Sequence, residues 1–452
     1  PHTESSVVGI VRSIGVTSPQ TIGATTYTFN NWSDGGAATH TISTPATDTT
    51  YTATFSGGSL QFYPLPRPVR LLDTRAGQPG CDMPGAPLNG GAERVQLARR
   101  TCDGVTIPSN ALAVTGNITP VPTSAGYLTL FPSQAARPLV ANSNFAAGEI
   151  VSNVFTVGLG TDGAFKIYAS TTTEVVIDVT GYYAPPSGSG LYYHPLPPPI
   201  RLLETRSGQP GCDAPAMPLI GGTTRTQQGR VMCNGVTIPN TAMALVGNAT
   251  VVYPSSAGYL TLFPGGVVQP YVSNGNFVGG DIVNTPFTVG LGNDGTFKLF
   301  TTSTTDLVVD VVGYFSPDAT DVNGVGLHFY PLGSPVRLLD SRINQPACYT
   351  PGQAFIGGVE YTQQARGSCL TQTIPNAAQA IVGNVTTVNP QSGWLTLWPS
   401  QLPRPLVSAL NFNTGQIANR HFMLGLGPDG AFNLYPSATT DLVIDLSGYF
   451  AP

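Results

Sequence analysis

The heptad VRLLDTR at 69–75 returns as IRLLETR at 200–206 and as VRLLDSR at 336–342, and this repeat decides the fold. Further blocks follow it in the same order in every copy; in the first copy they are TGNIT at 115–119, GYLTLFP at 126–132 and VVIDVTGYY at 175–183. Successive copies start 131 and 136 residues apart. That period is too long for a solenoid repeat and fits an independent domain. The sequence therefore predicts three tandem copies of one domain.

Most segments within a copy are typical of strands, because they are short, β-branched or aromatic, and bounded by turn residues. The 53 glycines and 41 prolines among 452 residues favour turns over long helices. An Asp-Gly pair such as Asp162-Gly163 lies between two such segments in each copy and predicts a hairpin turn. We therefore predict an all-β protein of three antiparallel β-sandwich or jelly-roll-like domains, preceded by a small β module.

The expected domains are separated by short linkers rich in Pro, Gly and Ser, as exposed boundaries usually are. Their ranges are 1–58 for the N-terminal module and 59–186, 187–320 and 321–452 for the three repeats. The chain begins at Pro1 with no Met and no signal-peptide pattern, so we expect a processed or partial product.

Composition disfavours several classes of protein. Charged residues make up only 10% of the chain, the net charge is −5, and the basic patch of a nucleic-acid binder is not expected. The 41% hydrophobic content can build cores, which disfavours disorder. No apolar run approaches the roughly 20 residues of a membrane span, so none is expected.

The six cysteines occur two per copy, and the members of each pair are always 21 residues apart. Metal binding is the weaker alternative, because no paired CxxC motif or histidine cluster accompanies them. One disulfide per domain is therefore predicted, and it implies an oxidising, extracytoplasmic compartment. The expected pairs are Cys81–Cys102, Cys212–Cys233 and Cys348–Cys369.

Over about residues 61–452, the RLLDTR opening, the GNxT and GYLTxxP blocks and the DxxGYF ending resemble a repeat of secreted and cell-surface bacterial proteins. The stretch WSDGGAATHTI…PATDTTYTATF at 32–55 resembles the C-terminal part of a bacterial immunoglobulin-like surface module. The resemblance implies an extracellular, multi-domain protein without assigned catalytic residues. It also implies that residues 1–58 form a partial immunoglobulin-like module.

An arginine and an aspartate recur within apolar strands of every copy. A buried carboxylate needs a partner, so we predict a bridge between them; a metal- or ligand-binding carboxylate is the alternative. The predicted ion pairs are Arg70–Asp178, Arg201–Asp310 and Arg337–Asp445.

Aromatic residues of the GYLTLFP block share one strand face, while its leucines point the other way. If the leucines line the core, the aromatic face is a candidate platform for sugars or for a neighbouring subunit; alternatively, a loop covers it. The residues concerned are Tyr127, Phe131, Tyr259, Phe263, Trp394 and Trp398.

Asn31, beside a turn, is the best candidate for glycosylation. The other sequon asparagines, Asn117, Asn248 and Asn384, lie within apolar strands and are expected to form structural hydrogen bonds. No catalytic motif is found, and the five histidines do not recur at one repeat position, so we expect no catalysis, no metal and no cofactor.

Two functions fit these observations. The first is an extracellular structural or adhesive protein that self-assembles into a bacterial filament, sheath or layer, with edge strands of residues 1–58 pairing with the next subunit. The second is a carbohydrate- or cell-wall-binding tail of a larger secreted enzyme. Further copies of the chain are therefore the expected partner, and surface glycans are the alternative.

Overall fold

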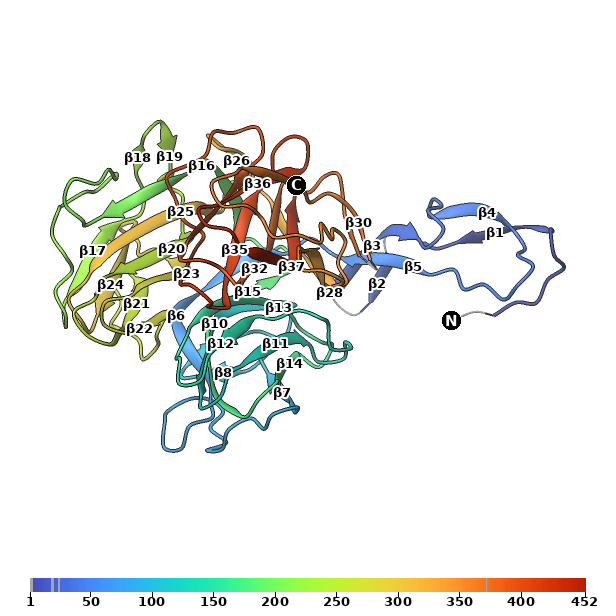
Figure 1. Ribbon diagram of the computed structural model, residues 1–452. Helices are drawn as coiled ribbons and strands as arrows, with labels where there is room; N and C mark the ends of the chain where they lie inside the picture. The colour runs from blue at the N-terminus through green and yellow to red at the C-terminus, as the bar shows by residue number, and fades with distance from the viewer. Residues whose placement is uncertain (1–2, 18–19, 23–24, 371) are drawn as a thin grey trace. The chain divides into compact units, whose positions relative to one another are not determined.

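The computed structural model describes residues 3–17, 20–22, 25–370 and 372–452, which form strands and turns (Figure 1). No helix occurs in these described residues, so the all-β prediction is confirmed. The chain divides into two compact units, Pro1–Ser59 and Leu60–Pro452. All three copies of the repeat therefore belong to a single unit.

The first unit has two small antiparallel sheets. One contains β1 (Val11–Gly15) and β4 (Thr39–Ser43), and the other contains β2 (Gln20–Ile22), β3 (Thr25–Trp32) and β5 (Ala53–Gly57). Trp32 is buried, and its ring lies 6.3 Å from that of Phe29. Val7, Val8 and Val11 are exposed. The described part of this unit thus has a small core and apolar residues on its surface, and its immunoglobulin-like character stays a prediction.

Each copy in the second unit has an inner four-stranded sheet with its RLLDTR strand at one edge. In spatial order these sheets are β13 (Asn153–Gly158), β10 (Ala113–Pro122), β15 (Thr173–Ala184) and β6 (Gln61–Asp73); β23 (Ile282–Gly290), β20 (Ala244–Val252), β25 (Asp306–Ser316) and β16 (Tyr192–Glu204); β35 (Ala418–Gly425), β32 (Ala380–Val388), β37 (Asp441–Ala451) and β28 (His328–Asp340).

Each copy also has an outer four-stranded sheet built around its GYLTLFP strand. These sheets are β12 (Ser143–Phe145), β11 (Gly126–Pro132), β14 (Ala164–Ala169) and β7 (Glu93–Leu97); β22 (Gly275–Phe277), β21 (Gly258–Pro264), β24 (Thr296–Thr301) and β17 (Thr224–Gln228); β34 (Leu410–Phe412), β33 (Gly393–Pro399), β36 (Ala431–Pro436) and β29 (Tyr361–Gln364).

Short two-stranded ribbons complete the unit. They are β8 (Thr101–Cys102) with β9 (Val105–Thr106), β18 (Met232–Cys233) with β19 (Val236–Thr237), β26 (Thr320–Asp321) with β27 (Gly324–Val325), and β30 (Gly367–Cys369) with β31 (Gln372–Ile374).

The two sheets of a copy enclose an apolar cluster. In the first copy, Leu128 and Leu130 of β11 share this cluster with Val114 and Ile118 of β10. Side chains alternate along a strand, so the leucines of the GYLTLFP block point into the core. Of the two faces that the sequence left open, the leucine face therefore lines the core between the inner and outer sheets.

The Asp-Gly turn has a different role from the predicted one. Gly163 adopts a φ of +77°, as such a turn requires. However, the turn connects β13 with β14, and these strands belong to different sheets. The hairpin predicted at Asp162-Gly163 is therefore wrong: the turn carries the chain from the inner sheet to the outer sheet.

The start of each copy takes part in a closed ring of main-chain hydrogen bonds. Leu60 pairs with Phe329, Phe62 with Leu191 and Tyr193 with Leu327, and each pair exchanges two N–H···O=C bonds of 2.8 or 2.9 Å. We call this arrangement the strand ring. Because the pairs connect the first copy to the second, the second to the third and the third to the first, every copy is bonded to both others.

Buried side chains from all three copies pack around the strand ring and form what we call the shared cluster. Its large members are Leu60, Phe62, Tyr183, Leu191, Tyr193, Phe315, Leu327, Phe329 and Phe450. The rings of Tyr183 and Phe329 have centroids 4.4 Å apart, and those of Phe62 and Phe315 are 4.3 Å apart. The shared cluster is thus a fourth core that no single copy contains.

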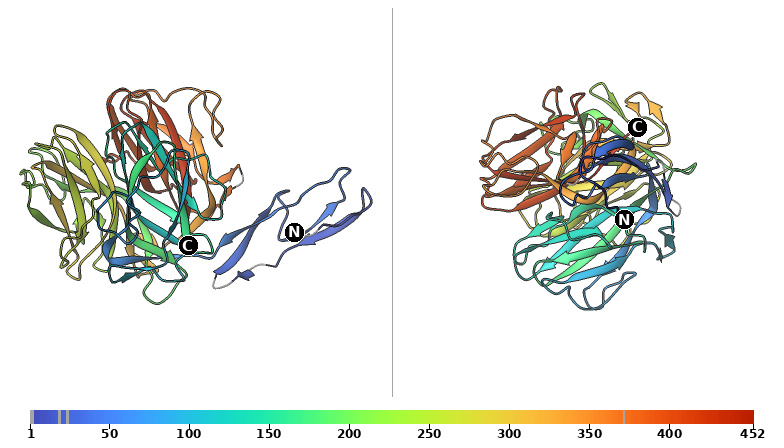
Figure 2. Two further views of the ribbon diagram at one scale, coloured as in Figure 1. Left: turned by 90° about the horizontal axis from the view of Figure 1, so that it is seen from below. Right: turned by 90° about the vertical axis from the view of Figure 1, so that its right-hand side faces the viewer.

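The prediction of three tandem sandwich or jelly-roll domains is wrong. The six four-stranded sheets, two from each copy, form one propeller-like ring (Figures 1 and 2). The predicted boundaries at 186/187 and 320/321 fall inside this unit. The physical reason is the shared cluster, because a copy that stood alone would expose its aromatic residues to water.

We expect Phe329→Ala to lower the free energy of unfolding by about 3–5 kcal/mol, because it opens a cavity in the shared cluster. Calorimetry should show that Leu60–Pro452 still unfolds in one transition, shifted to lower temperature. A separate transition for the third copy alone, with the other two unchanged, would contradict the shared core.

Candidate functional site

The structure brings together each predicted arginine and aspartate. Arg70 Nε lies 2.9 Å from Asp178 Oδ1, and the guanidinium also donates from Nη2 to Oδ2 over 3.3 Å. The same two-pronged geometry recurs, with identical distances, in Arg201–Asp310 and Arg337–Asp445. Since both carboxylate oxygens are engaged by the guanidinium, these aspartates are not arranged as free ligands for a metal.

A second carboxylate, three residues after the arginine, joins each pair. In the third copy, Asp340 accepts from Arg337 Nη1 over 3.2 Å and from Arg342 Nη2 over 2.7 Å. Burial acts to raise the pKa of Asp340, but hydrogen bonds from Arg342 outweigh it and hold the pKa below its usual value. The result is a compact cluster of two arginines and two carboxylates, which Arg70, Asp73, Arg75 and Asp178 form in the first copy.

These clusters lie at the boundaries between copies. The Ser408 amide donates to Asp310 Oδ2 over 3.5 Å, from the third copy to the second, and the Ala141 amide donates to Asp445 Oδ2 over 3.4 Å. Burial raises the pKa of Asp310 and Asp445, while the paired arginines act in the opposite direction. The arrangement favours the structural role predicted for the ion pairs and extends it to the joining of copies.

The sequon asparagines lie at the same boundaries. Asn117 Nδ2 donates to the carbonyl of Ser273 over 3.4 Å, and Asn248 Nδ2 donates to that of Ser408 over 3.2 Å. Asn384 accepts from Asn153 over 3.1 Å. All three sequon side chains are buried. Asn31 is part of β3, but its side chain lies outside those that the structure describes.

The boundary of the third copy contains two buried basic residues that the sequence reasoning did not single out. Arg420 donates from Nε to the carbonyl of Asn284 over 2.7 Å, and burial lowers its pKa to about 10. His421 Nε2 lies 3.3 Å from the hydroxyl of Thr156 in the first copy, and burial lowers the pKa of the histidine to about 3. The equivalent positions in the first copy are Asn153 and Val154, so the departure from the repeat was the available signal.

The cysteines of each copy are joined in the predicted pairs. The Cα–Cα distances are 5.6 Å for Cys81–Cys102, 5.6 Å for Cys212–Cys233 and 5.2 Å for Cys348–Cys369. Each bridge ties the loop after the RLLDTR strand to a short ribbon.

The predicted aromatic face is only partly exposed. Phe131, Phe263 and Trp398 are buried, so their prediction as parts of an exposed face is wrong. In the third copy the loop after the strand contacts this face, because Trp398 Nε1 donates to the carbonyl of Leu402 over 2.9 Å. The first aromatic residue of each strand remains accessible: Tyr127 is 38% exposed, Tyr259 36% and Trp394 48%.

The described residues form a small cavity but no metal-binding cluster. The described part of the chain contains no group of three His, Cys, Asp or Glu side chains placed to hold a metal. A cavity of about 30 Å³ lies between the second and third copies, lined by Asn248, Asp310 and His421 among others. That volume suits a buried water, whereas ligand pockets are usually about 300–1,000 Å³.

No family model and no curated protein matches the chain. One similar solved structure is described as "The Triple Jelly Roll Fold and Turret Assembly in an Archaeal Virus". The similarity covers 87% of this chain and 90% of that one, at 8% identity and a TM-score of 0.18, which is too low to support an argument about fold or function. The described residues also include no helix able to cross a membrane.

We expect Arg337→Met to destabilise the fold by about 3–5 kcal/mol, because it leaves the buried Asp445 carboxylate without its cation. Arg342→Met is the matched control and should cost about 1–2 kcal/mol, since Asp340 keeps its hydrogen bond from Arg337. Chemical denaturation measures both values. Equal effects of the two substitutions would contradict a dominant role for the Arg337–Asp445 pair.

We expect His421 to make the fold sensitive to acid. Its native pKa of about 3 lies below the unfolded value of about 6.5, so the unfolded chain takes up the proton first and stability falls as the pH drops. Between pH 7 and pH 5 the loss should be about 2 kcal/mol. The variant His421→Val has the residue found at the equivalent position of the first copy, Val154. In denaturant titrations it should lose less stability over this pH range than the natural chain does.

The buried aspartates with a raised pKa act in the opposite sense, because their protonation favours the native state. The measured quantity is therefore the difference in pH dependence between the natural chain and His421→Val. Parallel pH profiles would show that His421 is not the acid-sensitive group.

Proposed function

We propose that the protein is a non-catalytic extracellular structural and adhesive subunit that assembles with further copies of itself into a bacterial surface filament, sheath or layer. The observation that carries this proposal is the exposed apolar residues of the first unit, together with strand edges that have no partner among its described residues. Three disulfides support an oxidising, extracytoplasmic location.

The first unit is suited to strand addition. Strands β1 and β4 form a two-stranded sheet, so each has one edge without a partner in the described part of the chain. Such an edge presents N–H and C=O groups to an incoming strand, and a two-stranded ribbon is at best marginally stable alone. Val8 and Val11, which are exposed here, would gain burial from an added strand.

The second unit is suited to be a rigid building block. The strand ring and the shared cluster bind its three copies to one another. With only 10% charged residues, neighbouring subunits would meet little electrostatic repulsion on close approach. Head-to-tail pairing through the first unit would give an open polymer. Such contacts form a closed ring only when the rotation from one subunit to the next adds up to a full turn.

A second candidate function is carbohydrate binding, as the surface-attachment part of a larger secreted protein. The specific observation in its favour is the exposed aromatic residue at the same position of every copy, Tyr127, Tyr259 and Trp394. Exposed aromatic rings combine an apolar face with a polar edge and are common in binding sites.

We expect Val8→Asp together with Val11→Asp to prevent polymer formation, because the charges would have to be buried under the added strand. Both valines are exposed in the single chain, so its melting temperature should change little. Electron microscopy at micromolar concentration is the measurement.

Val268→Asp, at another exposed valine, is the control and should leave the polymers intact. Deletion of residues 1–59 should also abolish polymers while Leu60–Pro452 keeps its melting temperature. Polymers that persist in the double variant and in the deletion would refute strand addition through the first unit.

A further inference from the structure

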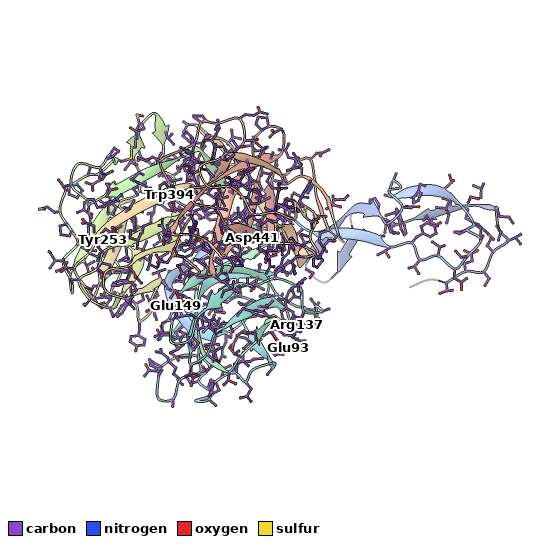
Figure 3. The ribbon with its side chains drawn as sticks, viewed as in Figure 1. Glu93, Arg137, Glu149, Tyr253, Trp394 and Asp441 are labelled. Carbon is purple, nitrogen blue, oxygen red and sulfur yellow. A yellow bond between two sulfur atoms is a disulfide. The ribbon has the colours of Figure 1, made fainter. Side chains whose placement is uncertain are left out.

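Two outer sheets carry a strip of two aromatic rings and an arginine. In the first copy, Tyr127 is 38% exposed and its ring lies 5.9 Å from that of Tyr168. The guanidinium of Arg137 stacks over Tyr168, with 3.9 Å between its central carbon and the ring centroid. Arg137 is labelled in Figure 3, on the first copy, and is itself exposed.

The third copy has an exposed aromatic residue, a second aromatic residue and an arginine at the same three repeat positions, and its first ring is larger. Trp394 is 48% exposed (Figure 3), and the guanidinium of Arg404 stacks 3.7 Å over the ring of Tyr435. Arg137 and Arg404 occupy the same position of the repeat, in PSQAARPLV at 132–140 and PSQLPRPLV at 399–407. Two independent positions of the chain therefore present the same combination of groups.

The second copy lacks the arginine. Its sequence PGGVVQPYV at 264–272 has Gln269 at the position of the arginine. Tyr259 is still exposed, and its ring lies 6.0 Å from that of Phe300. This copy keeps the aromatic rings and Lys298, which lies 5.7 Å from the ring centroid of Phe263, and it differs from the other two in having no arginine at this position.

Both arginines are available to form an ion pair with a ligand carboxylate. No carboxylate lies within ion-pair distance of Arg137 in the described part of the chain. The nearby Glu93 forms its ion pair with Lys166, at 3.1 Å. Arg404 does pair with Glu360 at 3.1 Å, but both side chains are well exposed and such a pair contributes little. A ligand carboxylate could therefore bind Arg137 directly and replace Glu360 at Arg404.

An exposed aromatic ring together with a guanidinium favours one class of ligand. An aromatic face packs against the apolar C–H face of a pyranose ring, while a guanidinium binds a carboxylate through two parallel hydrogen bonds. We propose that the first and third copies each bind a carboxylate-bearing sugar of an acidic polysaccharide, and that the second copy does not. The proposal rests on the carbohydrate-binding candidate and is independent of self-assembly.

The charge of the whole chain makes this selectivity testable. With a net charge of −5, the protein should repel a polyanion in general, so retention must come from local cations. Polygalacturonate, a polymer of carboxylated pyranoses, is the probe, and its methyl-esterified form is the matched neutral polymer. Polyphosphate is the control for binding of any polyanion.

The experiment is affinity electrophoresis of the full chain in native gels that contain each polymer. We expect retardation by polygalacturonate and at least tenfold weaker retardation by the esterified form. Arg137→Ala with Arg404→Ala should weaken binding at least tenfold, Tyr127→Ala with Trp394→Ala should also weaken it, and Gln269→Ala should have no effect. Melting temperatures verify that each variant is folded.

Each contrary result has a definite meaning. Equal retardation by the esterified polymer would overturn the carboxylate preference while leaving carbohydrate binding in place. Equal retardation by polyphosphate would overturn the role of the sugar ring. Absence of retardation by either polysaccharide would overturn both this inference and the carbohydrate-binding candidate, without bearing on polymers of the protein seen by electron microscopy.

Discussion

Reciprocal main-chain hydrogen bonds between the starts of the three copies are the constraint on which the second unit depends. Buried backbone N–H and C=O groups need partners, and those of Leu60, Leu191 and Leu327 find them only in another copy. A unit without one copy would leave these groups unpaired and would expose the aromatic rings packed around them. The three copies are therefore parts of one fold, although their sequence repeats like that of separate domains.

Buried polar residues at the boundaries between copies favour this one arrangement of the three copies over others. Each buried aspartate is held through both oxygens by an arginine of its own copy. One of these oxygens also faces the neighbouring copy, as Asp310 Oδ2 does toward the Ser408 amide. Buried ion pairs often add little net stability, but they penalise arrangements that leave a charge unpaired. The same residues thus connect the fold of each copy with its position in the ring.

The sequence predicted what repeats within a copy and failed where copies meet. Strands, disulfides and the Arg70–Asp178 pairing followed from residues that recur at fixed spacing. Alternation also assigned Leu128 and Phe131 to opposite faces of their strand, but it could not show that both are buried. Phe62 and Phe329 have the pattern of ordinary buried strand residues, and periodicity reveals burial without revealing the partner. The buried Arg420 and His421 break the repeat, so no copy offers a template for their contacts.

Native-state hydrogen exchange of the strand ring tests the account most directly. The amides of Leu60, Phe62, Leu191, Tyr193, Leu327 and Phe329 should exchange only by global unfolding, because each is bonded across a copy boundary in a shared core. The account predicts equal protection for all six, matching the free energy of unfolding of the whole second unit. Protection well below that of the amides inside each copy's own sheets would contradict it and would indicate three domains that associate loosely.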